Sequence, residues 1–467
     1  MAESLVKGRG FSDPFGIPSG PTAWMPPAPV ALVAAEFLIF GVRTPAALWC
    51  ALTLKCLGLA ASVYLLLGCL DDGRLYRWRY AAALAFVAVM GALPDFFLDL
   101  HDIWLVVLLA LALVRCFVPL MERRGDAPRM LMLALSVIAP MTSPALVPPF
   151  LALWGWVLFR AWRQRHECRG EPQSRVAAAQ FRLGAASLLL CIGSLLAWSA
   201  VTASRTGMVA PVKSNMWYDF YQANALEGDG LLRVSTFYRY HPIHSPAVLE
   251  RYVQEGEKAF MDWHRQQSMD FLRREPRQFL ARVARRASNA FVFLRPTDDV
   301  WEVDADQLDE GDVACLAAAG VIALDRHQST AEAPLYLWTN LSDTPERFSR
   351  YLAWLGPLEP EAIFEQWRFA GSEVVKLHRD ARTWLRGFAL AGLPSIALLL
   401  GLCDQGIRRD SVFRVSAVVY LGFLAPYVLI SHYARYQMFM LGVQALVVSF
   451  GFVAGWRLAR RVAGRAA

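Results

Sequence analysis

The chain alternates between long apolar runs and shorter polar linkers. Seven runs approach the length of about 20 apolar residues that a helix needs to cross a bilayer. They are Thr44–Leu70, Tyr80–Leu93, Ile103–Leu120, Leu183–Val201, Trp384–Leu402, Val412–Ile430 and Met438–Trp456. A further apolar stretch, Met130–Ala161, is interrupted by four prolines and is too long for one crossing, so it predicts a tight hairpin of two short helices. The pattern therefore predicts about nine membrane-spanning helices.

One long polar region, Thr202–Thr383, separates the earlier spans from the last three. Within it, Ala247–Arg274 repeats apolar residues at helical spacing. Phe279–Leu294 combines arginines with apolar residues in the manner of a basic amphipathic helix at a membrane surface. The stretch Thr297–Asp325 is acidic and is predicted to be an exposed loop. The region thus predicts a mainly helical domain outside the bilayer.

The composition agrees with this division. Of 467 residues, 56% are hydrophobic and 19% are charged, whereas soluble domains carry about a quarter charged residues and fewer apolar ones. A single soluble fold of this length could not bury so much apolar surface, which excludes a soluble enzyme. The expected fold class is an all-α polytopic membrane protein.

Arginines gather in every second linker and in the tail, and they predict the orientation of the spans. Positively charged loops stay in the cytoplasm, so residues 458–467 are expected inside and residues 202–383 outside. The predicted domains are then a transmembrane bundle over 44–201, the outer domain over 202–383 and C-terminal helices over 384–457. Multi-pass insertion in a membrane is the expected location.

The same orientation places residues 1–43 outside, as part of a first outer loop. This segment has no signal peptide and no preceding apolar run to carry it across the membrane. We therefore expect that a first transmembrane helix precedes Met1 and that Met1 is an internal methionine of a longer frame.

The first candidate for chemistry is the outer loop Asp95–Asp102, just before a predicted span. Carboxylates at a membrane boundary without basic neighbours are costly, which makes them candidates for function. A solvated loop with a helix N-cap at Asp102 would explain the same residues. The solvated loop is favoured for Asp95 and Asp99, whereas both interpretations stay open for His101 and Asp102.

The second candidate is Pro211–Gly230, which follows directly on a predicted span. Its aromatic residues alternate with amides and one lysine, a mixture that suits sugar rings, whose faces stack and whose hydroxyls need hydrogen bonds. An interfacial aromatic belt would supply the tryptophan and tyrosines but not the polar residues among them. The predicted sugar or acceptor contacts are Lys213, Asn215, Tyr218, Tyr221 and Asn224.

The third candidate is the short outer loop Ser431–Tyr436 before the last span. Its arginine, Arg435, breaks the charge rule that the other loops follow. A lipid phosphate would justify it, because guanidinium binds phosphate oxygens in bidentate fashion, although a headgroup anchor is the alternative. With His432 and Tyr436 beside it, the loop is predicted to be a phosphate site.

Other chemistries find no support in the sequence. There is no phosphate-binding glycine loop, dinucleotide fingerprint, zinc spacing or nucleophile elbow, and the eight cysteines read as small hydrophobic residues. We expect no metal, no cofactor and no nucleic-acid partner.

Several segments resemble one enzyme family. The segment Gly8–Phe15 (Gly-Arg-Gly-Phe-Ser-Asp-Pro-Phe), followed by Gly20–Trp24 and Pro26-Pro27, is similar to the first outer loop of bacterial GT-C membrane glycosyltransferases. These are relatives of protein mannosyltransferases and aminoarabinose transferase. Pro211–Gly230 resembles their sugar-region motif, Glu275-Pro276 their element before a basic helix, and Arg435-Tyr436 their closing motif. Only residues 297–383 look like an insertion.

The resemblance implies transfer of a sugar from a polyprenyl phosphate to a glycan, lipid or protein acceptor on the periplasmic side. Arg435 would hold the leaving phosphate, and Lys213 and Asn215 would line the sugar site. An aspartate early in the first outer loop is the family's general base or orients its acceptor. That position lies upstream of Gly8 in the family, and Asp102 resembles a second acidic position.

Two alternatives remain at this level. A transporter or flippase for lipid-linked sugars would place charges near the bilayer midplane, where this chain has only Lys55 and Arg115. A truncated, non-catalytic member of the family is the other alternative.

Overall fold

The computed structural model describes residues 1–71, 75–92, 102–122, 128–167, 172–226, 230–232, 240–242, 245–292, 387–432 and 434–466. These residues are almost entirely helical, and the described part contains isolated β-bridges but no β-strand. Six of its helical segments are long and apolar enough to cross a membrane: 45–71, 103–121, 144–165, 174–206, 411–429 and 436–463. The predicted all-α class is therefore confirmed for the described residues, which hold six candidate membrane spans where the sequence predicted about nine.

Each predicted apolar run corresponds to a helix. The bundle consists of α3 (Pro45–Asp71), α4 (Arg79–Ala92), α6 (Ile103–Met121), α7 (Arg129–Thr142), α8 (Val147–Glu167), α9 (Pro172–Thr206), α19 (Leu393–Cys403), α21 (Ser411–Leu429) and α22 (Leu441–Ala466). The proline-rich stretch forms two consecutive helices as expected, joined by Ser143 and a short turn over Pro144–Leu146, but not a tight hairpin of short helices: α8 is long enough to cross a membrane, and α7 packs mainly against α9. Three helices, α4, α7 and α19, are shorter than a full crossing and fall outside the six candidate spans.

Helix α6 forms the centre of the bundle. Its apolar segment is 78% buried, compared with 28% for α3 and 22% for α9, which carry large apolar side chains on their outer faces. A helix that is apolar on all sides belongs inside a protein, whereas outer helices can present apolar surface to lipid. Asp102 at the start of α6, which the sequence analysis singled out, is less deeply buried than the helix that follows it.

Close contacts at glycines give the relative directions of the helices. A Cβ atom at Gly58 would lie 2.4 Å from Trp104, and one at Gly68 would lie 3.3 Å from Arg115, so α3 and α6 run parallel. The same reasoning makes α8 and α21 antiparallel, because Gly422 meets Pro149 while the Arg414 guanidinium lies over the Trp156 ring. These directions are the ones that the alternation of charged linkers predicts.

The two ends of the bundle differ in character. At one end, Arg79 pairs with Asp71, Arg160 donates a hydrogen bond of 2.8 Å to the Met121 carbonyl, and Arg457 lies 3.5 Å from Asp404. We call this the basic end. The opposite end, where α6 begins and α21 finishes, carries the remaining candidate residues and is called the distal end below.

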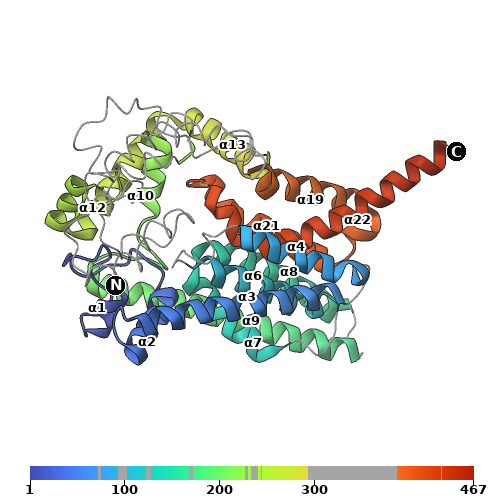
Figure 1. Ribbon diagram of the computed structural model, residues 1–467, viewed down its shortest axis with the longest axis horizontal. Coiled ribbons are helices and arrows are strands. Elements are labelled where there is room, and N and C mark those ends of the chain that lie inside the picture. Colours follow the sequence, from blue (N-terminus) through green and yellow to red (C-terminus); the bar gives the residue numbers. More distant parts are fainter. Residues whose placement is uncertain are drawn as a thin grey trace, which may run out of the picture.

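A smaller helical region covers the distal end. It contains the end of α9, the short helix α10 (Met216–Tyr221), α12 (Pro246–Arg274) and α13 (Pro276–Val292), and it forms one side of the molecule in Figure 1. Helices α12 and α13 closely match the two stretches predicted from the polar region. The C-terminal half of α22 extends away on the other side of the molecule (Figure 1).

The N-terminal residues contain a helix that the sequence pattern did not predict. Residues 1–43 were expected to be loop, yet Pro27–Phe40 forms helix α2, with prolines at its start where a missing amide hydrogen costs nothing. At 14 residues α2 is about 21 Å long, too short to cross a bilayer. It packs between α1 (Ala2–Val6) and α3 near the distal end.

A buried glutamate, Glu257 of α12, ties the N-terminal segment to this covering region. Its carboxylate accepts hydrogen bonds from the Ala23 amide at 3.0 Å, from the Ser214 hydroxyl and from the Tyr252 hydroxyl at 2.9 Å. Next to it, Trp24, Tyr218, Tyr252, Phe260 and Met261 form a small core of their own.

We expect Glu257→Ala to destabilise this region by about 3 kcal/mol, because buried donors would lose their acceptor. Thermal unfolding followed by tryptophan fluorescence measures the change, since Trp24 lies in the adjoining core. The matched control is Glu255→Ala, whose carboxylate forms an exposed pair with Arg251 and contributes less than about 1 kcal/mol. Equal melting temperatures for the two variants would contradict the cross-linking role of Glu257.

Candidate functional site

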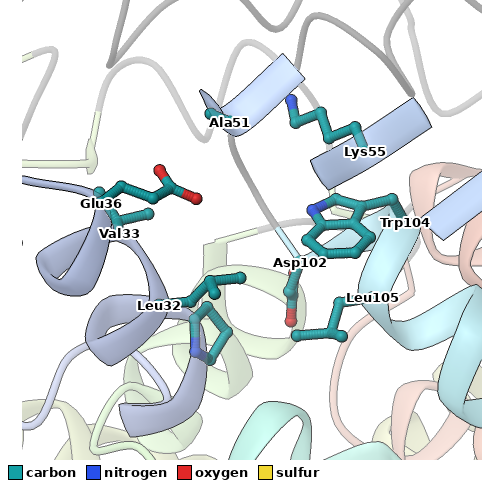
Figure 2. Close-up of a pocket in the computed structure, with 9 residues that line it drawn as sticks. Leu32, Val33, Glu36, Ala51, Lys55, Asp102, Trp104 and Leu105 are labelled. Carbon is teal, nitrogen blue, oxygen red and sulfur yellow. The ribbon is translucent and has the colours of Figure 1, made fainter. Parts of the chain in front are cut away.

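Asp102 lies where α6 begins at the distal end. It occupies the N-cap position, but its side chain makes no capping hydrogen bond; only its carbonyl joins the helix, accepting from the Val106 amide at 2.8 Å. Capping of the helix by the side chain, which the sequence analysis offered as an alternative, therefore does not explain why an aspartate occupies position 102. Asp102 instead lines a pocket between α2, α3 and α6, as Figure 2 shows.

Two buried charges that the sequence analysis did not assign to a site share this pocket. Glu36 of α2 is 5% exposed and Lys55 of α3 is 3% exposed. All three residues line this pocket together with apolar residues that include Leu32, Val33 and Leu105, but in Figure 2 the Lys55 ammonium points toward Ala51 and the Asp102 carboxylate toward Leu105. Because α3 and α6 run parallel with Gly58 beside Trp104, Lys55 lies level with the start of α6, ten residues after α3 begins at Pro45.

On the other side of Asp102, the last turn of α21 carries Tyr427. This ring stacks on Tyr436, with ring centroids 3.7 Å apart and planes inclined by 19°. The Ser143 side chain and the charges of Asp102 and Asp219 act on the Tyr427 hydroxyl. Tyr427 thus connects three segments that the sequence analysis predicted separately: the start of α6, the stretch after α9 and the loop before α22.

Lys213 and Asp219 add a charge pair to this place. The Lys213 ammonium lies 3.8 Å from the Asp219 carboxylate, and both side chains remain partly exposed. Asn215, between them, begins α10, and its Oδ1 is buried with no hydrogen-bond partner in the described part of the chain. The exposed ammonium is the one cation among the sugar-contact residues, and it is able to contact an anionic ligand.

The aromatic candidates of the same segment differ in their surroundings. Tyr218 is buried; its hydroxyl donates to the Tyr240 carbonyl at 2.9 Å and accepts from Gln222 at 2.7 Å. Burial raises its pKa well above the usual value. Tyr221 is half-buried and packs edge-on against Trp263 and His264. Tyr218 therefore belongs to the core, whereas Tyr221 keeps some exposed surface.

Asn224 is also fully engaged within the protein. Its amide donates to the Phe220 and Ile430 carbonyls at 2.9 Å each, and its Oδ1 accepts from Arg286 at 2.9 Å. Arg286, on α13, is completely buried and also donates to the carbonyls of Gly230, Val428 and Leu429. Burial lowers the pKa of Arg286 to about 10, so it stays charged at neutral pH and neutralises the exposed carbonyl end of α21. We call this arrangement the Arg286 clasp.

The third predicted site is described only in part. His432 is 1% exposed, and neither ring nitrogen has a hydrogen-bond partner among the described residues. Burial, together with the Arg286 charge, lowers its pKa to about 3, so the ring is neutral and supplies no positive charge to a phosphate. The backbone of Arg435 lies in the short helix Ala434–Met440 together with Tyr436, but its side chain and all of His101 lie outside the described residues.

At the distal end, Lys213 pairs with Asp219, Tyr427 stacks on Tyr436, and the charges of Asp102 and Asp219 act on the Tyr427 hydroxyl. Carboxylates can accept a proton from or orient a hydroxyl, a lysine can bind a phosphate, and stacked tyrosines offer a face and hydroxyls to a sugar ring. The described residues contain no group of three or more His, Cys, Asp or Glu side chains placed to hold a metal ion.

No protein-family model, curated protein or solved structure matches this chain.

Proposed function

We propose that this protein is a membrane glycosyltransferase that moves a sugar from a polyprenyl-phosphate donor to an acceptor of the bacterial cell envelope. The observation that supports this best is the meeting of Asp102, the Lys213–Asp219 pair and the Tyr427–Tyr436 stack at one end of the bundle. Residues from three distant segments supply the acid, the cation and the ring surface that sugar transfer from a lipid phosphate requires.

In this proposal each group has a separate role. Asp102 accepts a hydrogen bond from the acceptor hydroxyl, which attacks the anomeric carbon as the lipid phosphate leaves. Lys213 stabilises charge that develops on the phosphate oxygens, and Arg435, at the start of the Ala434–Met440 helix, is assigned to the same phosphate. The stacked tyrosines hold the sugar. No metal or cofactor is assigned a role.

The proposed orientation follows from the charges. The basic end of the bundle, which carries Arg79, Arg160 and Arg457, is assigned to the cytoplasm, and the distal end then faces the periplasm of a bacterial inner membrane. On that side a sugar bound to a polyprenyl phosphate is available, whereas nucleotide sugars are cytoplasmic substrates.

A flippase for the same lipid is less well supported. A flippase needs polar groups along the bilayer to pass the headgroup across it. The buried pair Glu36 and Lys55 instead lies level with the start of α6, at the same end as Asp102. Arg115 of α6 is the one further charge that the sequence places near the midplane, so the described bundle offers few polar groups along the bilayer, which favours a reaction at one membrane face.

The proposal is tested by turnover of the purified full-length protein in detergent. The protein is incubated with a radiolabelled polyprenyl-phosphate hexose and with glycan, lipid and protein acceptors in turn. We expect release of polyprenyl phosphate together with label on one acceptor class. Donor that stays intact with every acceptor, while labelled lipid exchanges between leaflets of reconstituted vesicles, would support the flippase instead.

A further inference from the structure

Gln437 follows directly on Tyr436 in the short helix Ala434–Met440, and its side chain is buried. It is 2% exposed, and its Nε2 atom donates a hydrogen bond of 2.7 Å to the Ala290 carbonyl of α13. Ala290 lies in the last turn of α13, where carbonyls have no partner within the helix. The Gln437 amide therefore satisfies a buried carbonyl of a neighbouring helix.

A second buried amide, Gln444 of α22, extends this contact. Its Nε2 atom donates hydrogen bonds of 2.9 Å to Oε1 of Gln437 and 2.9 Å to the Leu390 carbonyl. Leu390 lies in the π-helical turn Phe388–Gly392 that precedes α19. We call Gln437 and Gln444 the amide pair. It connects α13, the beginning of α19 and the last membrane span at one point.

The amide pair and the Arg286 clasp hold the two rings of the Tyr427–Tyr436 stack from the same helix. Arg286 donates to the carbonyls of the two residues that follow Tyr427. Ala290, one turn further along α13, accepts from the residue that follows Tyr436. Positions four apart lie on one face of a helix, so a single face of α13 holds the backbone next to each ring.

The hydrogen bonds of Gln437 also fix the direction of the Tyr436 ring. The helix Ala434–Met440 is a 3₁₀-helix, in which successive side chains point about 120° apart. Gln437 points into the protein, while the partly exposed Tyr436 stacks on Tyr427. Hydrogen bonds are directional, whereas apolar packing tolerates rotation. Bonds to both ends of the Gln437 amide therefore restrict rotation of this short helix and of the ring that it carries.

We propose that Gln437 is a positioning residue for the glycosyl transfer, which holds the Tyr436 ring in the orientation that contacts the donor sugar. This inference rests on the proposed function. Gln437 itself contacts no substrate and transfers no proton. Because the ring contacts the sugar before and during transfer, a displaced ring weakens binding of the donor and leaves the rate of the bound complex nearly unchanged.

The test compares wild type, Gln437→Met and Gln180→Met in the polyprenyl-phosphate release assay, with the donor concentration varied. Methionine keeps the length of the side chain and removes its amide. Gln180 is the matched control, because it is 9% exposed and donates to the Leu120 carbonyl at 3.3 Å at the basic end. We expect Gln437→Met to raise the donor KM about tenfold with kcat changed less than about threefold, and Gln180→Met to change neither.

A double variant separates positioning from a general loss of packing. Tyr436→Ala removes the ring, so Gln437→Met added to it should raise the donor KM no further. Gln444→Met removes the hydrogen bond to Oε1 of Gln437 but not the one to Ala290, and it should raise KM about threefold. This milder variant carries the test where Gln437→Met does not fold.

Three results would overturn the positioning role. They are an unchanged donor KM in both variants of the amide pair, an equal increase in Gln180→Met, and additive increases in the double variant. Wild-type protein that releases no polyprenyl phosphate would instead contradict the proposed function, and the positioning role with it.

Discussion

Replacement of Asp102 by Asn lowers the rate of sugar transfer about 1,000-fold in our account. The substitution keeps the size of the side chain but removes the negative charge that orients the acceptor hydroxyl and stabilises positive charge developing on the sugar. The N-cap position should tolerate Asn, since Asn is among the best N-cap residues and the Asp102 carboxylate makes no capping hydrogen bond. Release of radiolabelled polyprenyl phosphate per minute, with saturating acceptor, measures the effect.

The matched control for this variant is Asp71→Asn. Asp71 pairs with Arg79 at the basic end of the bundle, so its loss leaves the distal end untouched. Both variants should melt within a few degrees of wild type. An Asp102→Asn protein that turns over as fast as Asp71→Asn would show that the carboxylate at the start of α6 takes no part in the reaction.

Replacement of Arg286 by Met has the largest expected effect on stability, a loss of about 3–5 kcal/mol. The guanidinium donates to the carbonyls of Gly230, Val428 and Leu429 and to the Asn224 side chain, and all four acceptors would be left without it. A lysine at position 286 provides one compact charge instead of a planar guanidinium with several donors. It should therefore recover only part of the lost stability. Thermal unfolding in detergent, with each variant at equal concentration, measures the difference.

Arg286 also positions the site. Val428 and Leu429 follow directly on Tyr427, so the Arg286 clasp holds the turn that carries the Tyr427–Tyr436 stack. Turnover of Arg286→Met should therefore fall even at temperatures where the protein stays folded. Arg285→Met is the control, because the neighbouring Arg285 side chain is exposed on the same helix. Equal stability of the two variants would contradict the clasp.

The membrane helices could be predicted from the sequence because lipid imposes a simple condition. Every spanning helix must be apolar over most of its length, so each apolar run located a helix, although α9 begins 11 residues before its predicted start and α22 ends 10 residues after its predicted end. Helix α2 was not predicted, because the condition that lipid imposes applies only to helices that cross the membrane. Its 14 residues are too few for a span, and the proline-rich start at Pro26 and Pro27 reads as loop.

The site could be predicted only in part. Shared outward orientation was enough to group Asp102, Lys213 and Tyr436, since the charge pattern places all three at one membrane face. The sequence could not distinguish side chains that point into the core from those that point into the site. Tyr218, Asn224 and His432 carry the polar groups expected of ligand contacts, yet the protein itself surrounds all three.

The sequence analysis did not assign three residues to the candidate site, and for two of them the neighbouring sequence gives no indication of their role. Arg286 lies in a helix with three other arginines, and only the packing of α13 on the end of α21 distinguishes it. Tyr427 lies inside an apolar span, where an aromatic residue is ordinary. Glu36 did leave a signal, because a lone carboxylate in an apolar stretch is costly, but Lys55 and Asp102, which line the same pocket, lie far from it in the sequence.

The central claim is that the lipid donor binds where Asp102, Lys213 and Tyr436 meet, and photo-crosslinking tests it most directly. A photoreactive phenylalanine analogue replaces Tyr436 at the distal end of the last membrane span or Trp456, which is 54% exposed near its basic end. Our account predicts that radiolabelled polyprenyl-phosphate hexose is captured at position 436 and not at 456, and that excess unlabelled donor prevents the capture. Equal labelling at both positions, or labelling that unlabelled donor does not reduce, would contradict it.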